Sequence, residues 1–234
     1  MPRPSVIAHR GASGYEYENS LAAFRRAVTL DADGIELDVH ATRDGRLVVH
    51  HDPVFPALGP IRESDLAALR RVPLPNGEPI PLLSEVLEVV GNRDVWVEVK
   101  ALDSVWDSAL LAVLSAGPAP DRYAVHSFDH RLVRRLGTLN PALRRGILLS
   151  AYLVDPLSAM QAAGASTLWQ EWHHIDEDLA RTVHAGGHAL VAWTVDELAD
   201  LRRLARLGVD GLCGSYPDRI RVAIGLGSAL ASEA

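Results

Sequence analysis

The 234-residue sequence predicts an α/β protein with a (β/α)₈ (TIM) barrel fold, and three observations support this. Short apolar runs of strand length alternate with amphipathic stretches of helical period along the whole chain. The chain is long enough, because a barrel of this kind needs roughly 200 residues or more. The glycine-rich turn of dinucleotide-binding folds is missing after the first strand, so an open doubly wound sheet is the weaker alternative.

The predicted strands are short aliphatic runs, because strands that are buried on both faces read as continuous apolar segments. In chain order they are Val6–His9, Gly34–Val39, Val95–Lys100, Tyr123–His126, Gly146–Leu149, Ser166–Trp169, Ala189–Val195 and Gly211–Cys213. A further strand-like run, Leu47–His51, follows the second strand too closely for a helix to lie between them.

The segments between the strands carry apolar residues at helical spacing, as Leu21, Phe24 and Val28 do in the first of them. The predicted helices are Ser20–Leu30, Leu83–Val90, Ser104–Leu114, His130–Leu136, Pro156–Ala163, Asp176–Ala185, Asp196–Leu207 and Pro217–Ile224. Their expected N-caps include Asp176 and Asp196, and their expected stops include Gly164, Gly186 and Gly208.

The organisation along the chain predicts one barrel domain over residues 1–224, since no linker or shift in composition divides it. Residues 53–82 form a Pro-rich insertion after the second strand, with one expected helix over Glu63–Arg71. Residues 225–234 are expected to be a C-terminal tail.

Two neighbouring strands alternate in a way that places acids inside the barrel. In the second strand the aliphatic residues share one face and Glu36 and Asp38 share the other, and in the third strand three valines lie opposite Glu98 and Lys100. Buried carboxylates are costly unless they are paired or bind a metal. The pattern favours a site for Mg²⁺ or Ca²⁺, which prefer oxygen ligands, and the alternative is a buried ion-pair cluster around Lys100.

A hairpin is expected to bring a histidine to this site. If Asp44 and Gly45 form a two-residue turn, the pairing places His51 opposite Asp38. The same register turns His50 to the other side of the strand. The alternative is that these histidines belong to a polar surface loop.

The first strand ends in His9, Arg10 and Gly11, at the end of the barrel where active sites lie. Arg10 is suited to bind phosphate by two hydrogen bonds, and His9 is placed for proton transfer. Glu18 and Asn19 come just before the first helix, where they either orient Arg10 or cap the helix.

Together these motifs resemble the glycerophosphodiester phosphodiesterase family across residues 6–218. The matching segments include His9-Arg10-Gly11, Glu18-Asn19-Ser20, Asp33-Gly34-Ile35-Glu36-Leu37-Asp38-Val39, His51-Asp52, Val97-Glu98-Val99-Lys100 and Trp193-Thr194-Val195.

The resemblance implies a metal-dependent barrel enzyme that converts glycerophosphodiesters to glycerol 3-phosphate and an alcohol. By matched position it implies metal ligands at Glu36, Asp38 and Glu98, a general acid–base pair at His9 and His51, and substrate contacts at Arg10, Lys100 and Trp193. The nucleophile is either water or a neighbouring glycerol hydroxyl, which would give a cyclic phosphate first.

The insertion departs from the family pattern, because Pro53-Val54-Phe55-Pro56 follows His51-Asp52 where the family often has Asp-Arg-Thr-Thr. Two other functions therefore stay open. One is a lysophospholipase D-type or cyclising phospholipase-like enzyme, which would need an apolar groove at the mouth, with candidates Trp172, Trp193, Val54 and Phe55. The other is a non-catalytic barrel that binds phosphodiesters.

The net charge of −7, from 23 Lys+Arg against 30 Asp+Glu, argues against nucleic acid as the main partner. A small phosphodiester is the expected partner, and the oligomeric state stays open. No apolar stretch approaches membrane-span length, so stable membrane insertion is not expected. The single cysteine, Cys213, excludes an intramolecular disulfide and is expected to be a buried strand residue, in keeping with a cytoplasmic location.

Overall fold

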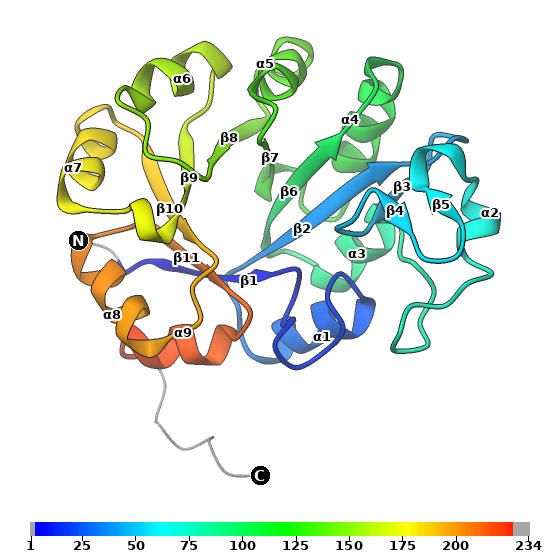
Figure 1. Cartoon of the computed structure of the whole chain (residues 1–234), viewed down its shortest axis with the longest axis horizontal. Coiled ribbons are helices and arrows are strands. Elements are labelled where there is room, and N and C mark those ends of the chain that lie inside the picture. Colours follow the sequence, from blue (N-terminus) through cyan, green and yellow to red (C-terminus); the bar gives the residue numbers. More distant parts are fainter. Residues whose placement is uncertain (1–2, 227–234) are drawn as a thin grey trace.

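A computed structural model describes residues 3–226 as a closed barrel of parallel strands with helices around it, which confirms the predicted fold (Figure 1). The barrel closes because β1 pairs with both β2 and β11. Its strands are β1 (Ser5–His9), β2 (Gly34–Ala41), β6 (Asp94–Ala101), β7 (Tyr123–Ser127), β8 (Arg144–Leu149), β9 (Thr167–Glu171), β10 (Ala189–Trp193) and β11 (Gly211–Gly214).

The helices cover the outside of the barrel, where their apolar faces pack on the outward aliphatic residues of the strands. They are α1 (Leu21–Thr29), α3 (Leu83–Val90), α4 (Asp107–Ala116), α5 (His130–Leu139), α6 (Pro156–Ala163), α7 (Glu177–Ala185), α8 (Leu198–Leu207) and α9 (Pro217–Ala223). None of the helices in the described part of the chain is long and apolar enough to span a membrane.

The predicted helices are present with ends that shift by up to three residues, and one predicted cap is wrong. Gly164 and Gly208 end α6 and α8 in the left-handed conformation. The side chain of Asp176 accepts a hydrogen bond from Leu179 N and caps α7 as predicted. The predicted cap at Asp196 is wrong, because its carboxylate instead accepts hydrogen bonds from the backbone N and the hydroxyl of Ser215, at 2.6 and 2.9 Å.

The hairpin register differs from the prediction by one residue. The strand β3 (Leu47–Val49) runs antiparallel to β2, and His50 N donates to Asp38 O at 3.0 Å, so that His50 lies opposite Asp38. The turn is larger than predicted because Thr42 N bonds Arg46 O across residues 43–45. The Thr42 hydroxyl reinforces this turn by bonding the carboxylate of Asp44 at 2.6 Å.

The insertion lies at one edge of the barrel, where it is cyan in Figure 1. It contains the short strands β4 (Val54–Phe55) and β5 (Gly59–Pro60), a 3₁₀ turn (Ile61–Glu63) and the helix α2 (Leu66–Leu69). The expected helix over Glu63–Arg71 is wrong in its length, because Glu63 lies in the 3₁₀ turn and α2 spans only Leu66–Leu69. A small apolar cluster of its own holds the segment together: Val48, Phe55, Ile61, Leu69, Leu74 and Ile80.

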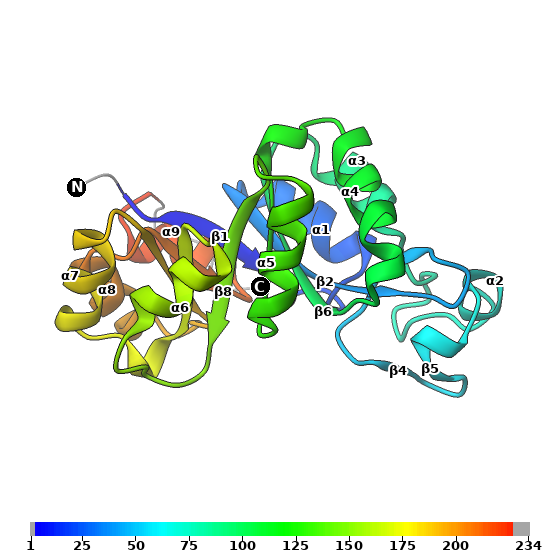
Figure 2. The same ribbon diagram turned by 90° about the horizontal axis from the view of Figure 1, so that it is seen from above.

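Toward the N-terminal ends of the strands, the inside of the barrel is filled by apolar side chains: Ile7, Trp96, Ala124, Leu148, Trp169, Val191 and Cys213. We call this part of the interior the lower level, and the part toward the C-terminal ends of the strands the upper level. Cys213 is fully buried there, as the sequence predicts. Figure 2 shows the insertion projecting past the barrel, beside the ends of β2 and β6. Residues 227–234 of the expected tail lie outside the described residues.

Candidate active site

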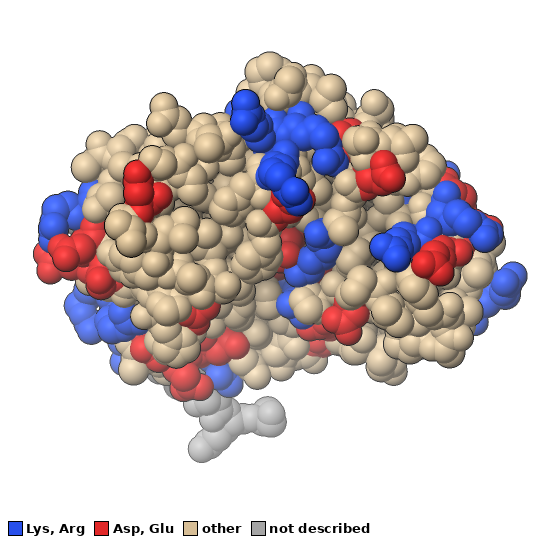
Figure 3. All heavy atoms as spheres, turned by 45° about the horizontal axis from the view of Figure 1, so that its top comes forward, with Lys and Arg blue, Asp and Glu red and all other residues tan. Residues whose placement is uncertain are grey.

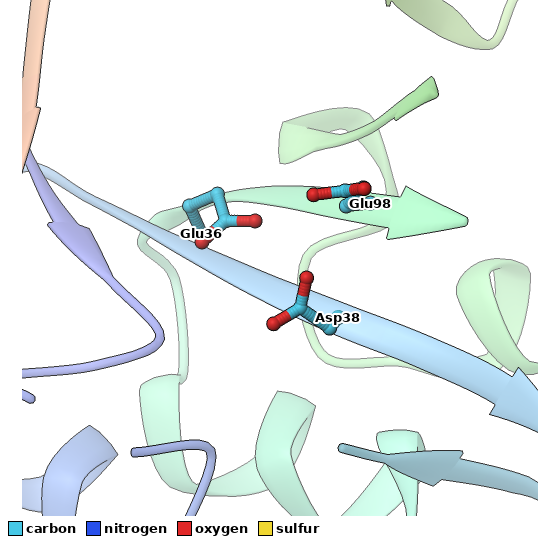
Figure 4. A group of neighbouring side chains, drawn as sticks. All are labelled: Glu36, Asp38 and Glu98. Carbon is cyan, nitrogen blue, oxygen red and sulfur yellow. The ribbon is translucent and has the colours of Figure 1, made fainter. Parts of the chain in front are cut away.

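Three carboxylates converge inside the upper end of the barrel. Glu36 and Asp38 project from β2, and Glu98 projects from β6 directly beside Asp38. Figure 4 shows the three groups turned toward one another. One oxygen of each lies within 4.8 Å of the others, and all three residues are buried. The inward direction that strand alternation predicts for these acids is what the structure shows.

Two cations contact this group. Lys100 Nζ lies 2.9 Å from Asp38 Oδ1 and 2.7 Å from Glu98 Oε1. Arg10 Nε lies 3.1 Å from Asp38 Oδ2. Among the residues that the structure describes, the backbone N–H of Arg10, at 3.2 Å, is the one donor within hydrogen-bond distance of Glu36. The pairing therefore concentrates on Asp38 and leaves Glu36 with little compensation.

The loop after β1 holds Arg10 in a demanding backbone conformation. Arg10 and Asn19 both have a positive φ, 54° and 55°, which is uncommon for residues other than glycine and tends to occur at functional sites. Asn19 Nδ2 donates to Asp38 Oδ2 at 2.8 Å, and Arg10 Nη1 donates to Glu18 Oε2 at 2.8 Å. Gly11 is required beside them, because a Cβ there would lie 2.7 Å from the backbone of Ala23.

The pKa values show where negative charge is in excess. Burial, with Asp38 nearby, raises the pKa of Glu36 to about 8. Burial also raises the pKa of Glu98 to about 7 against the effect of Lys100. Burial works in the same direction on Asp38, but Lys100 and Arg10 bring its pKa down to about 2. The raised pKa values lie at Glu36 and Glu98, and three converging oxygen donors of which two lack sufficient compensation fit a hard divalent cation.

Both predicted catalytic histidines line one cavity of about 90 Å³ beside these acids. His9 Nε2 lies 3.4 Å from Thr194 Oγ1, and burial together with the charge on Arg10 lowers the pKa of His9 to about 3. His51 Nδ1 lies 2.8 Å from Asp52 Oδ1. His50 turns away and packs edge-on against Phe55, with the ring centres 5.2 Å apart.

The same cavity is lined by Arg10, Lys100 and Trp193. The ring of Trp193 lies edge-on to Phe128, with the ring centres 5.6 Å apart. The buried indole N–H of Trp193 has no hydrogen-bond partner among the described residues. The cavity therefore brings two cations and an aromatic side chain together with the histidines.

His126 is a site residue that the sequence reasoning missed. It lies on β7 beside Glu98, is fully buried, and lines the cavity. Its Nε2 lies 3.7 Å from Glu36 Oε1, and its ring packs against both Trp96 and Trp169, which also contact each other. Neither ring nitrogen has a hydrogen-bond partner within the described chain. The alternation of inward and outward side chains that places the acids of β2 and β6 inside the barrel applies to β7 as well. There His126 follows the outward-facing Val125, so its inward direction could have been predicted.

The charged residues on the face in Figure 3 are of mixed sign. Much of this face is uncharged, and a strip of Lys and Arg side chains near its upper centre has Asp and Glu side chains beside it.

Comparison with known proteins gives a consistent result at the level of sequence. A family model described as "Glycerophosphoryl diester phosphodiesterase family" matches residues 9–219. A glycerophosphodiester phosphodiesterase of Caldanaerobacter subterraneus is 32% identical over 231 residues, which covers 92% of this chain and 95% of that protein. A glycerophosphodiester phosphodiesterase of Bacillus subtilis is 28% identical, over 91% of this chain and 84% of that protein.

The fold comparison agrees with these matches. The structure of a phosphodiesterase from Oleispira antarctica, in complex with the product sn-glycerol-3-phosphate, superposes with a TM-score of 0.89. The two sequences are 26% identical, and the match covers 95% of this chain and 97% of that one.

Proposed function

Because the chain belongs to the glycerophosphoryl diester phosphodiesterase family, we propose that it hydrolyses a glycerophosphodiester to glycerol 3-phosphate and an alcohol, using a divalent metal ion. The observation that carries this proposal is a cavity lined by two cations and three histidines, His9, His51 and His126, beside the three buried carboxylates. A barrel that only bound phosphodiesters would not need two imidazoles beside a metal site.

In the proposed site Glu36, Asp38 and Glu98 would hold Mg²⁺ or Ca²⁺. A bound divalent ion neutralises charge on a non-bridging phosphate oxygen and polarises the phosphorus–oxygen bond. The fit rests on the three facing carboxylate oxygens and on the raised pKa of Glu36, which a nearby cation would lower.

The cations of the site bind the phosphate in this proposal. Arg10 and Lys100 line the cavity and supply positive potential where the negative charge of the transition state develops. Glu18 and Asn19 support them, because Glu18 bonds the Arg10 guanidinium and Asn19 bonds Asp38. Trp193 lines the same cavity and is assigned a contact with the substrate.

The histidines move the protons. One of His9 and His51 takes the proton from the nucleophile, and the other protonates the leaving alkoxide, which is a poor leaving group near neutral pH. Asp52 accepts a hydrogen bond from His51 Nδ1–H, which leaves Nε2 of His51 for the substrate. His9 is held between Glu36 and Thr194.

The decisive assay is the release of glycerol 3-phosphate from glycerophosphocholine by the purified protein, with chelator and then with Mg²⁺ or Ca²⁺ restored. We expect turnover that chelator abolishes and metal restores. His9→Ala and His51→Ala should each lower kcat by about 10²–10⁴-fold while metal binding, measured by calorimetry, persists.

His184→Ala is the matched control, since His184 bonds Asp210 on the outside of the barrel. Full activity in either active-site variant would contradict its assignment. Turnover of lysolipids alone would instead support the lysophospholipase D-type function, and binding without turnover would support a non-catalytic barrel.

A further inference from the structure

We propose that the leaving alcohol of the diester lies in a groove between the insertion and the loop after β6, and that this alcohol is uncharged, with an alkyl or aromatic body. The inference rests on the proposed function, because it concerns one product of that reaction. It goes further by assigning a binding site and a chemical class to the alcohol.

The two cavities of this face differ greatly in size and meet at one residue. The cavity at the histidines has a volume of about 90 Å³, and the groove has a volume of about 830 Å³. Lys100 is the residue that lines both of them. In this proposal a phosphate bound at Lys100 directs one ester arm toward each cavity.

Size decides which arm lies in which cavity. The smaller one holds the volume of about three water molecules, which suits a compact fragment such as glycerol. The groove is in the range that accommodates molecules of about 300–1,000 Å³. The groove is therefore left for the alcohol.

The walls of the groove are mostly apolar. They include Pro53, Val54 and Pro60 from the insertion, Leu102 and Trp106 from the loop after β6, and Leu132 from α5. The side chain of Val54 is exposed, with 52% of its surface accessible, although its neighbour Phe55 is buried. When an apolar ligand covers an exposed aliphatic side chain of the groove, the free energy of the complex is lowered.

The charges of the groove argue against a cationic alcohol. Each of the three carboxylates that line it in the described chain already has a partner. Asp129 binds the guanidinium of Arg131 at 2.9 Å, Asp103 accepts from Val105 N at 3.2 Å, and Glu63 lies 3.6 Å from Arg62. A quaternary ammonium group would therefore compete with existing partners.

The test uses a series of glycerophospho-n-alkyl esters from ethyl to hexyl. These alcohols are nearly equal as leaving groups, so a change in KM along the series reports binding of the chain. With partial burial of each added methylene, we expect KM to fall about tenfold from ethyl to hexyl. We also expect a lower KM for the 3,3-dimethylbutyl ester than for the choline ester, which has the same shape and a positive charge.

Val54→Asp places a charge in the groove and should flatten the dependence of KM on chain length. Leu139→Asp is the matched control, because Leu139 is exposed to a similar degree, 56%, at the C-terminal end of α5 outside the groove. We expect this control to keep the wild-type dependence. Thermal melting of both variants checks that they fold.

Three results would overturn the inference: a KM that does not change with chain length, a lower KM for the choline ester, or the wild-type dependence in Val54→Asp. If the ethyl ester is cleaved but KM does not change along the series, the binding site for the alcohol is rejected and the proposed function stands. Failure to cleave any ester rejects the proposed function, and the inference with it.

Discussion

The barrel interior has two levels, and the same strands build both. On β1, Ile7 packs in the lower level and His9 reaches the upper one, and on β6 Trp96 precedes Glu98 by two residues. Two residues along a strand return to the same face, so a single alternation supplies a dry core below and a charged site above. The lower level therefore stabilises the fold, whereas the upper level places buried carboxylates, which are unfavourable for folding, at the proposed active site.

The largest expected effect comes from breaking the upper level at Asp38, which both cations and Asn19 contact. Asp38→Asn removes the charge that holds Arg10 and Lys100 together. We expect kcat/KM to fall about 10³-fold or more, together with the loss of metal binding in calorimetry. Asp121→Asn, at an exposed position, is the control. Tight metal binding by Asp38→Asn would remove Asp38 from the ligand set.

The lower level should respond in stability instead. Trp169 is fully buried and contacts both Trp96 and His126. Trp169→Ala is expected to reduce the free energy of unfolding by about 3–5 kcal/mol, since a large cavity would form. Urea unfolding measures this loss. A loss below about 1 kcal/mol would mean that the packing of the lower level contributes little to the free energy of unfolding.

The carboxylates of the upper level also predict that the stability of the metal-free protein depends on pH. The folded-state pKa values of Glu36 and Glu98, about 8 and about 7, lie above the value near 4.5 for an unperturbed glutamate. The folded state therefore binds more protons than the unfolded state at neutral pH. This contribution to stability is complete below pH 4.5 and is lost as the pH rises through 7 and 8.

From pH 7 to pH 9 in chelator, we expect the free energy of unfolding to fall by on the order of 1–2 kcal/mol. Urea unfolding at the two pH values measures the change. Glu36→Gln should make the dependence weaker, because the titrating group is gone. A stability that rises over this range would contradict the assigned direction of the Glu36 and Glu98 shifts.

The smallest expected effect is at His126, where the two levels meet. His126→Phe keeps a ring packed against Trp96 and Trp169 but removes two buried nitrogens that lack partners in the described chain. We expect no loss of thermal stability, and a fall in kcat/KM of about tenfold because Glu36 loses a polar neighbour. A lower Tm with unchanged kcat/KM would show that His126 serves packing alone.

Much of the fold and of the site could be predicted because the signals were local. Strand alternation placed Glu36, Asp38 and Glu98 inside the barrel, and the order of strands and helices predicted a closed parallel sheet. The hairpin register could not be predicted in the same way. It depends on hydrogen bonds of the Thr42 hydroxyl, which enlarge the turn and shift the pairing by one residue.

The sequence by itself determined the fold class, the inward direction of the acids and the candidate catalytic set, because each follows from a period of two residues or a short motif. Only the tertiary structure decided which groups meet across the barrel. It brought His126 toward Glu36, set the left-handed turns at Arg10 and Asn19, and formed the groove beyond Lys100. These features depend on barrel closure and on how the insertion packs, and both are long-range contacts that no local pattern encodes.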